Sequence, residues 1–142
     1  MKLDYAGCSE CGPVRGHNED AVLMCTSGEA GLFLVADGVG GRSNGEIVSG
    51  RIHDTYERWW KEVFLHPKKK PDFLTALKQI EESLLRLNRE LVQEFGQMNA
   101  GSTLVLLFLY NRNFACVSLG DSRIYRVRGL SVKQITHDDT FR

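Results

Sequence analysis

Residues 32–41 read Leu-Phe-Leu-Val-Ala-Asp-Gly-Val-Gly-Gly, and this stretch decides the fold. The apolar part, Leu32 to Ala36, has the length and composition of a buried strand. Asp37 follows, and glycine occupies three of the next four positions, which frees the backbone to turn sharply and approach a ligand. A carboxylate at the end of a core strand is a candidate ligand. The alternative is an ordinary Asp-Gly turn between a strand and a helix.

A second acidic cluster lies upstream, in the stretch Arg-Gly-His-Asn-Glu-Asp at residues 15–20. Hard divalent cations take oxygen ligands and are held by a few carboxylates that converge from different segments. Glu19, Asp20 and Asp37 have that character. Arg15 carries a planar fork that matches two phosphate oxygens. A weak surface ion pair between Arg15 and one of the neighbouring carboxylates is the alternative.

A third region predicts three consecutive strands. Residues 101–110 read as a strand buried on both faces, and residues 114–119 and 124–128 as two more. Residues 111–113 form a short turn, and Gly120-Asp121 makes a tight connection to the third strand. Asp121 therefore stands at a strand end, as Asp37 does.

The middle of the chain predicts two long helices. From Glu46 to about His66, apolar residues recur at helical spacing, and Trp59-Trp60 reads as one core and one rim residue. Prolines then interrupt the pattern, and a second helix runs from an N-cap at Asp72 to about Phe95-Gly96. Together with the strands, this indicates an α+β fold with antiparallel strands and two long helices.

Composition restricts the function. The chain has 142 residues, of which 42% are hydrophobic, with 18 basic and 18 acidic side chains. A formal net charge of zero argues against a nucleic-acid partner. Because no apolar stretch is long enough to span a bilayer and no signal peptide is evident, we expect no membrane partner and a cytoplasmic location. Four cysteines, with one Cys-x-x-Cys pair at 8–11, favour free thiols over zinc.

Taken in order, these segments resemble the metal-dependent protein phosphatases, the type 2C serine/threonine phosphatases, and most closely their bacterial branch. The matching stretches are residues 12–20, 35–41, 45–46, 101–104, 119–125 and 135–138. The resemblance implies hydrolysis of phosphoserine and phosphothreonine in proteins by a metal-activated water. It also implies Mn²⁺ or Mg²⁺ as cofactor, with two ions and a third, weaker site in the complete domain.

The resemblance implies a role for each matching position. Asp37 corresponds to the carboxylate that bridges two metals, and Gly38 supplies a backbone carbonyl to one of them. Glu19 corresponds to a ligand of the other metal, and Asp20 to an acid that orders metal-bound water.

Two more implied roles and one departure complete the site. Arg15 corresponds to the phosphate-binding arginine, and Asp121 to an acid of the third metal site. Some family members carry a histidine after the Asp-Gly pair that is thought to protonate the leaving alcohol. This chain has Val39 there, so we assign no general acid.

The resemblance also sets expectations for architecture. Family domains form a four-layer α-β-β-α sandwich, of which this chain supplies a part, and they continue into an Asp-Gly and an Asp-Asn motif whose aspartates complete the metal pair. Residues 1–142 therefore read as a single, apparently truncated phosphatase domain, for which we expect dimerisation or strand exchange. Phosphoproteins, in particular those of a serine/threonine kinase, are the implied substrates. The alternative is a catalytically inactive module that binds phosphoproteins or regulates a kinase pathway.

Overall fold

The computed structural model describes residues 2–13, 16–40, 44–65 and 69–139. Its elements, in chain order, are β1 (Asp20–Ser27), β2 (Ala30–Val39), α1 (Asn44–Trp60), a π-helical turn η1 (Lys61–Leu65), α2 (Phe73–Phe95), a 3₁₀ turn η2 (Gly96–Met98), β3 (Gly101–Ser102), β4 (Leu104–Tyr110), β5 (Asn113–Leu119), β6 (Tyr125–Arg128) and β7 (Ser131–Gln134).

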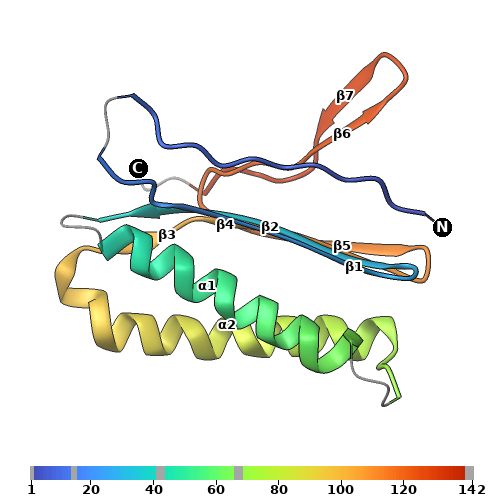
Figure 1. Cartoon of the computed structure of the whole chain (residues 1–142), viewed down its shortest axis with the longest axis horizontal. Helices are drawn as coiled ribbons and strands as arrows, with labels where there is room; N and C mark the ends of the chain where they lie inside the picture. The colour runs from blue at the N-terminus through green and yellow to red at the C-terminus, as the bar shows by residue number, and fades with distance from the viewer. Residues whose placement is uncertain (1, 14–15, 41–43, 66–68, 140–142) are drawn as a thin grey trace.

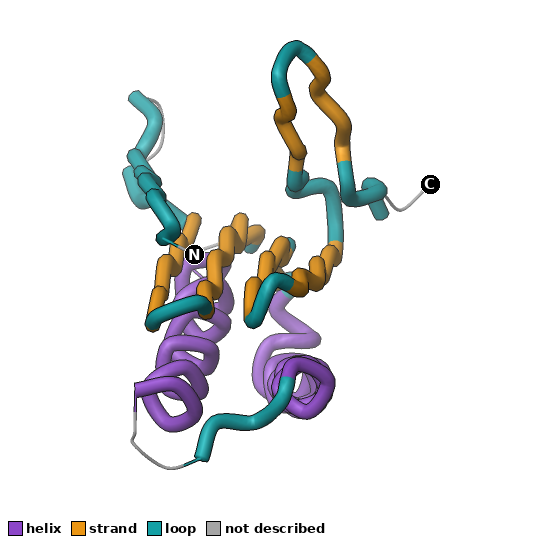
Figure 2. The backbone as a smooth tube through the Cα atoms, turned by 90° about the vertical axis from the view of Figure 1, so that its right-hand side faces the viewer, coloured by secondary structure: helices purple, strands orange, loops and turns teal. Residues whose placement is uncertain are grey.

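The elements form layers around one antiparallel sheet. Its strands are ordered β1-β2-β4-β5, with the short β3 also paired to β2. Helices α1 and α2 cover one face, whereas the N-terminal segment and the separate β6-β7 hairpin lie on the other (Figures 1 and 2). The α+β prediction with antiparallel strands and two long helices is therefore confirmed.

The core lies between the helices and the inner face of the sheet. Cross-strand partners such as Leu34 and Leu106 point to this face, because side chains alternate along a strand. Trp60 stacks on Phe64 with ring centroids 4.5 Å apart. Trp59 and Trp60 are both buried, so the prediction that one of them lies at the rim is wrong.

Helix α2 begins and ends at the residues that the sequence predicts. The Asp72 side chain accepts a hydrogen bond from the Thr75 N–H at 2.7 Å, which is N-cap geometry. At the other end Gly96 keeps helical dihedral angles, and the chain reverses at Asn99, where φ is 49°. Among the described residues, neither helix has the apolar length needed to cross a bilayer.

Strand β2 is longer than predicted. It continues through Asp37 to Val39, and its last two residues pair with β3. The expected sharp turn after Ala36 is therefore wrong. The run of glycines allows the strand to continue where α1 and the chain before β1 approach it closely.

The outer face of the sheet is only partly covered. Tyr5 lies against Phe33 with ring centroids 5.7 Å apart, while Val35 is 41% exposed. Phe114 on the edge strand β5 is 60% exposed. The prediction that residues 101–110 form a strand buried on both faces holds in part, because Val105, which faces outward opposite Val35, is buried, whereas Leu107 and Leu109 are half-buried. The expected association with a second copy stays a prediction.

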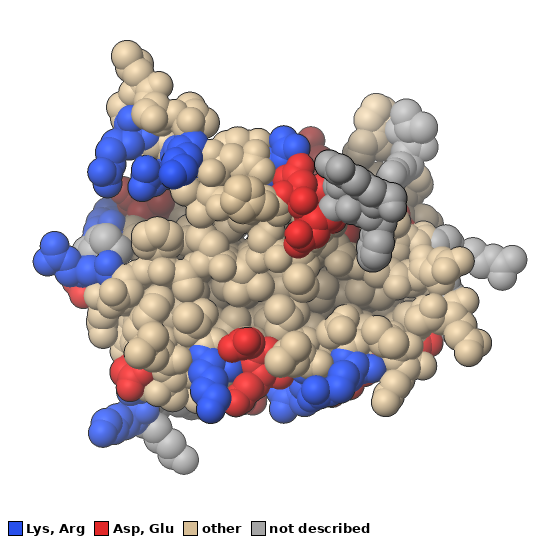
Figure 3. Space-filling model, turned by 180° about the vertical axis from the view of Figure 1, so that it is seen from behind, with Lys and Arg blue, Asp and Glu red and all other residues tan. Residues whose placement is uncertain are grey.

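The strand predicted at residues 124–128 is present as β6, but the β6-β7 hairpin does not extend the main sheet. It forms its own two-stranded sheet, in which Val127 pairs with Val132 and Arg126 with Lys133. Directly opposed residues share a face, so the hairpin has an apolar face and a basic face. Basic side chains gather on this projecting hairpin, whereas both signs of charge alternate along the helical layer (Figure 3).

A polar clamp closes the base of the hairpin. The Arg123 guanidinium donates to both carboxylate oxygens of Asp138, at 2.6 to 3.2 Å, and to the Tyr125 hydroxyl at 3.2 Å. Gln134 also donates to Asp138. The bonds from Arg123 lower the pKa of Asp138 and raise that of Arg123.

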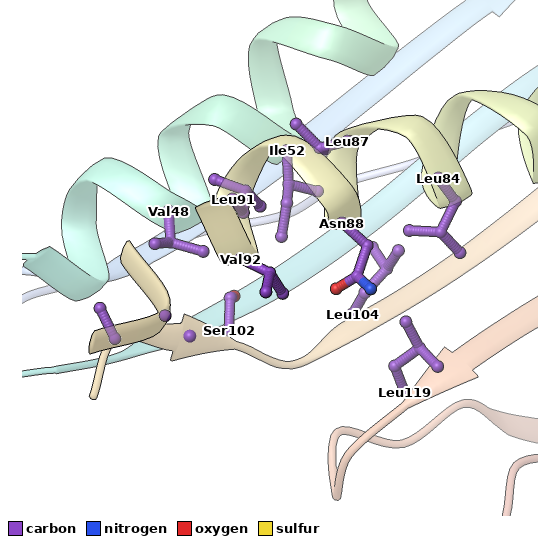
Figure 4. Close-up of a pocket in the computed structure, with 13 residues that line it drawn as sticks. Val48, Ile52, Leu84, Leu87, Asn88, Leu91, Val92, Ser102, Leu104 and Leu119 are labelled. Atoms are coloured by element: carbon purple, nitrogen blue, oxygen red, sulfur yellow. The ribbon is translucent and has the colours of Figure 1, made fainter. Parts of the chain in front are cut away.

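A small apolar cavity of about 160 Å³ remains where α2 crosses β3 and β5. Ile52, Leu87 and Leu91 point toward it from the two helices, and Leu104 and Leu119 from the strands (Figure 4). The cavity lies on the helix side of the sheet, so it is distinct from the acidic residues considered below.

We expect Ile80→Ala to destabilise the fold by about 2 to 5 kcal/mol, because the side chain is fully buried and its loss leaves a cavity. Leu74→Ala on the same helix is the matched control. Its side chain is 74% exposed, so the free energy of unfolding should change by less than about 0.5 kcal/mol. Urea unfolding measures both, and equal losses would contradict the assigned core.

The clamp predicts a pH-dependent contribution to stability. Because folding lowers the Asp138 pKa below its ordinary value of 3.8, the clamp stabilises the folded chain above that pH, and its contribution is lost as the pH falls through the folded pKa. Asp138→Asn should therefore lower the urea midpoint at pH 7. The difference in urea midpoint between the variant and the wild type should disappear in acid. A difference that is unchanged at pH 2 would contradict the stabilising role of the Asp138 carboxylate.

Candidate functional site

An open cleft lies at the end of β2, beside the start of β1 and the loop after β5. Glu19, Asp37, Gly38 and Asp121 line it, together with Thr103. A second hollow adjoins it and is lined by Glu19 and Asp37 again, with Asp20 and His17. Five of the six site residues predicted from the sequence are thus brought to neighbouring hollows. Arg15, the sixth, lies outside the described residues.

The register of β1 and β2 places two carboxylates face to face. Asp20 is the direct cross-strand partner of Asp37. Since the Gly38 N–H donates to the Glu19 carbonyl at 3.1 Å, the next pair along, Asp20 and Asp37, falls at a non-hydrogen-bonded position. Side chains are closest at such positions, with Cα atoms about 4.5 Å apart. Like charges so placed repel, and a cation between them would relieve that repulsion.

The Glu19 backbone joins β2 to the first turns of α1. Its carbonyl accepts from the Gly38 N–H and from the Ser49 hydroxyl, the latter at 2.6 Å. A Cβ atom on Gly38 would run into the Gly45 carbonyl and the Glu19 carbonyl. Glycine at 38 is therefore needed for close approach of three backbone segments. The expectation of a close backbone approach at this glycine is correct, although the approaching group here is protein.

The loop before β1 has its own hydrogen bonds. The Asn18 side chain donates to Ser9 at 2.7 Å and accepts from the Asp20 N–H at 3.0 Å. The second bond is an Asx turn, which sets the direction in which the chain enters β1. Asn18 thereby orients the backbone that carries the two adjacent acids.

Residues 102 and 103 hold the Asp37 backbone on the side of β2 that faces away from β1. The Thr103 N–H and the Ser102 hydroxyl both donate to the Asp37 carbonyl, at 2.9 and 3.1 Å. The Asp37 N–H donates to the Thr103 hydroxyl at 3.1 Å. Both the N–H and the carbonyl of Asp37 are thus held by residues 102 and 103.

Asp121 follows β5, as the sequence predicts. Gly120 before it has a φ of 89°, a left-handed conformation that favours glycine. Ser122 after it lies 2.6 Å from the Thr103 hydroxyl. Farther along, the Asp139 N–H donates to the Gly120 carbonyl at 2.8 Å, so the end of the described chain supports the same loop.

The chemistry of the cleft is that of oxygen ligands. In the part of the chain that the structure describes, no three His, Cys, Asp or Glu side chains lie together in a group that could hold a metal ion. The acids instead line an open cleft, together with the backbone at Gly38. Cys8 and Cys11 are exposed, and Cys8, Cys25 and Cys116 are free thiols. Burial raises the pKa of the thiols of Cys25 and Cys116.

Sequence reasoning missed three hydroxyl residues that hold the site together. These are Ser49, Thr103 and Ser122. Thr103 and Ser122 fall within stretches that carry the family resemblance, but only the strand register shows what they bond. Ser49 lies on the buried face of α1, where a polar side chain requires a hydrogen-bond partner. Its position on that face was the one sign in the sequence that it has a structural role.

We expect Gly38→Ala to destabilise the protein by about 1 to 3 kcal/mol, because the added methyl meets rigid backbone atoms. Gly50→Ala is the matched control. Nothing lies near its Cβ position inside α1, and alanine there should stabilise the helix by about 0.5 to 1 kcal/mol. Urea unfolding of the two variants tests this, and a Gly38 variant as stable as the wild type would contradict the close approach.

Comparison with known proteins agrees with this geometry. The chain is 31% identical to the serine/threonine protein phosphatase PstP of Mycobacterium tuberculosis, over 99% of this chain and 26% of that protein. The PstP catalytic domain, solved in complex with two manganese ions, superposes with a TM-score of 0.73 at 30% identity, over 97% of this chain and 56% of that one.

PppA of Pseudomonas aeruginosa is 37% identical, with a TM-score of 0.75, over 92% of this chain and 54% of PppA. The chain therefore spans about half the length of these two solved chains. The family model for protein phosphatase 2C matches residues 15–142. The chain belongs to the protein phosphatase 2C family.

Proposed function

We propose that this chain provides the acidic half of a metal-dependent phosphatase site that hydrolyses phosphoserine and phosphothreonine in proteins. The carrying observation is the cross-strand pair of Asp20 and Asp37 at the end of the sheet. Glu19 and Asp121 border the same cleft as Asp37. Family membership supports the reaction class, and the whole protein's activity belongs to the proposal because the chain spans only part of its relatives.

The donor set fits a hard divalent cation. Carboxylate and backbone carbonyl oxygens are the ligands that Mg²⁺ and Mn²⁺ prefer, and no nitrogen or sulfur donor is needed. The two manganese ions bound by the PstP catalytic domain support Mn²⁺ for this chain. When bound, a pair of divalent ions lowers the pKa of a shared water and neutralises phosphoryl oxygens during in-line attack.

Each residue has a distinct role in this proposal. Asp37 lies between the two hollows and would contact both ions, while the Gly38 carbonyl would bind one of them and Glu19 the other. Asp20, directly across the strand from Asp37, would orient water by accepting its hydrogen bonds. Asp121 would serve a third, weaker site.

Substrate binding and leaving-group departure involve two further positions. Arg15 would bind the phosphoryl group through its planar fork. Val39, 62% exposed and lining the cleft, cannot transfer a proton. The leaving alkoxide therefore takes its proton from another group or from water, and we assign no general acid.

The proposed substrates are phosphorylated proteins, among them those of a serine/threonine kinase, in the cytoplasm. The balanced charge of 18 basic and 18 acidic residues gives no reason to expect nucleic acid as a partner. The neighbouring hollows are open to solvent, so a phosphorylated side chain can reach the acids without a conformational opening.

We expect Mn²⁺-dependent hydrolysis of a phosphothreonine peptide by the whole protein, abolished by a chelator. Asp37→Asn should lower the hydrolysis rate and the Mn²⁺ affinity by on the order of 100-fold. The reason is that it removes the negative charge of the residue that lines both hollows. Asp4→Asn is the control, since Asp4 is exposed in the N-terminal segment and outside the cleft. Phosphate release and calorimetric titration with Mn²⁺ are the measurements.

Three outcomes separate the possibilities. Turnover that both chelator and Asp37→Asn abolish supports the enzyme for this chain. Phosphopeptide binding without turnover supports the inactive binding module that is the alternative function. Retained turnover in Asp37→Asn would overturn the assignment of the cleft.

A further inference from the structure

Thr103 interrupts the strand ladder beside Asp37. Val35 lies opposite Val105 and Gly38 opposite Ser102, so the register places Asp37 directly opposite Thr103. In an ordinary antiparallel pair the two residues exchange two backbone N–H to carbonyl bonds. Here only one is present, from the Thr103 N–H to the Asp37 carbonyl.

A side-chain hydroxyl replaces the second ladder bond. The Asp37 N–H donates to the Thr103 Oγ1 atom at 3.1 Å. The Thr103 carbonyl instead lies 2.8 Å from the Ser102 hydroxyl, whose single proton it shares with the Asp37 carbonyl at 3.1 Å. This exchange explains why residue 103 belongs to neither β3 nor β4, although both strands share one register with β2.

The same hydroxyl contacts the loop that carries Asp121. Thr103 Oγ1 and Ser122 Oγ lie 2.6 Å apart, a hydrogen bond in which either can donate. On the other side of Asp121, a Cβ atom on Gly120 would lie 2.8 Å from the Thr103 methyl carbon. Thr103 thus contacts the residues before and after Asp121 and also holds the amide of Asp37.

We propose that Thr103 is a positioning residue that couples the two acidic parts of the cleft. Its hydroxyl fixes the Asp37 backbone and the Asp121 loop relative to each other, so a displacement of one is transmitted to the other. Thr103 lines the same cleft as these two acids. The consequence for metal binding rests on the proposed function, whereas the coupling itself does not.

The first test uses the metal-free chain and residue-resolved amide hydrogen exchange by NMR. Thr103→Val keeps the shape and removes the hydroxyl, so exchange should accelerate about three- to tenfold at Asp37 and throughout Gly120 to Ser122. Ser122→Ala should accelerate amide exchange at Asp37, because Ser122 shares a hydrogen bond with the Thr103 hydroxyl that holds the Asp37 N–H. Thr103→Ser retains the hydroxyl and should restore protection at Asp37.

The second test is a double-mutant cycle on Mn²⁺ affinity, measured by calorimetry with MnCl₂ as the probe. Thr103→Val should weaken binding about three- to tenfold and Ser122→Ala by less. The double variant should bind no more weakly than Thr103→Val alone, because both changes break one shared hydrogen bond. Thr103→Ser should bind as the wild type does.

The outcomes distinguish this inference from the proposed function. Losses of Mn²⁺ affinity that multiply in the double variant would overturn the coupling. An amide exchange rate at Asp37 that Ser122→Ala leaves unchanged would also overturn it. A wild-type chain that binds no Mn²⁺ would count against the proposed function, and the exchange data would then decide the coupling alone. A Thr103→Val variant too unstable to measure is covered by Ser122→Ala and Thr103→Ser.

Discussion

The site depends on the register of β1 against β2. Asp20 opposes Asp37 only because the Glu19 carbonyl accepts from the Gly38 N–H one position along. A slip of one residue would move every side chain of β1 to the other face of the sheet, and with it Asp20. The apolar side chains that β1 and β2 send to the helix side, including Leu23 and Leu34, specify that register. The hydrophobic core therefore aligns the acids.

Much of the fold could be predicted from local patterns. The N-cap at Asp72 and the helical period of α2 were readable because both depend on residues close in sequence. The turn between β4 and β5 was also correct, with Asn111 and Arg112 both at positive φ, as a two-residue hairpin loop requires. What failed depended on distant partners. The extension of β2 to Val39 requires β3, which is more than 60 residues away, and the exposure of the outer sheet face depends on what packs there.

The candidate site likewise has parts that could be predicted from the sequence and parts that could not. The acids were found because several carboxylates occur in two separate segments and because these segments resemble a known family. That Asp20 and Asp37 are cross-strand neighbours could not be read from either segment alone. The hydroxyl of Thr103 has no signal in a single sequence, since its partner is a backbone group on another element, and Ser49 is marked only by its place on the buried face of α1. Residue types that carry charge are visible in a sequence, whereas residues that hold a backbone in place become visible only with the fold.

The bond between the Asp37 amide and Thr103 joins residues 66 positions apart, with both long helices in the intervening loop. Closing a loop of that length costs chain entropy before any contact offsets it, so such pairings form late in folding. The β1-β2 hairpin and the two helices involve far shorter separations and can form first. The cleft between Asp37 and Asp121 is then among the last parts of the molecule to assemble. During synthesis, a chain released before β3 and β4 emerge would expose its acids on a hairpin that has no counterpart strand.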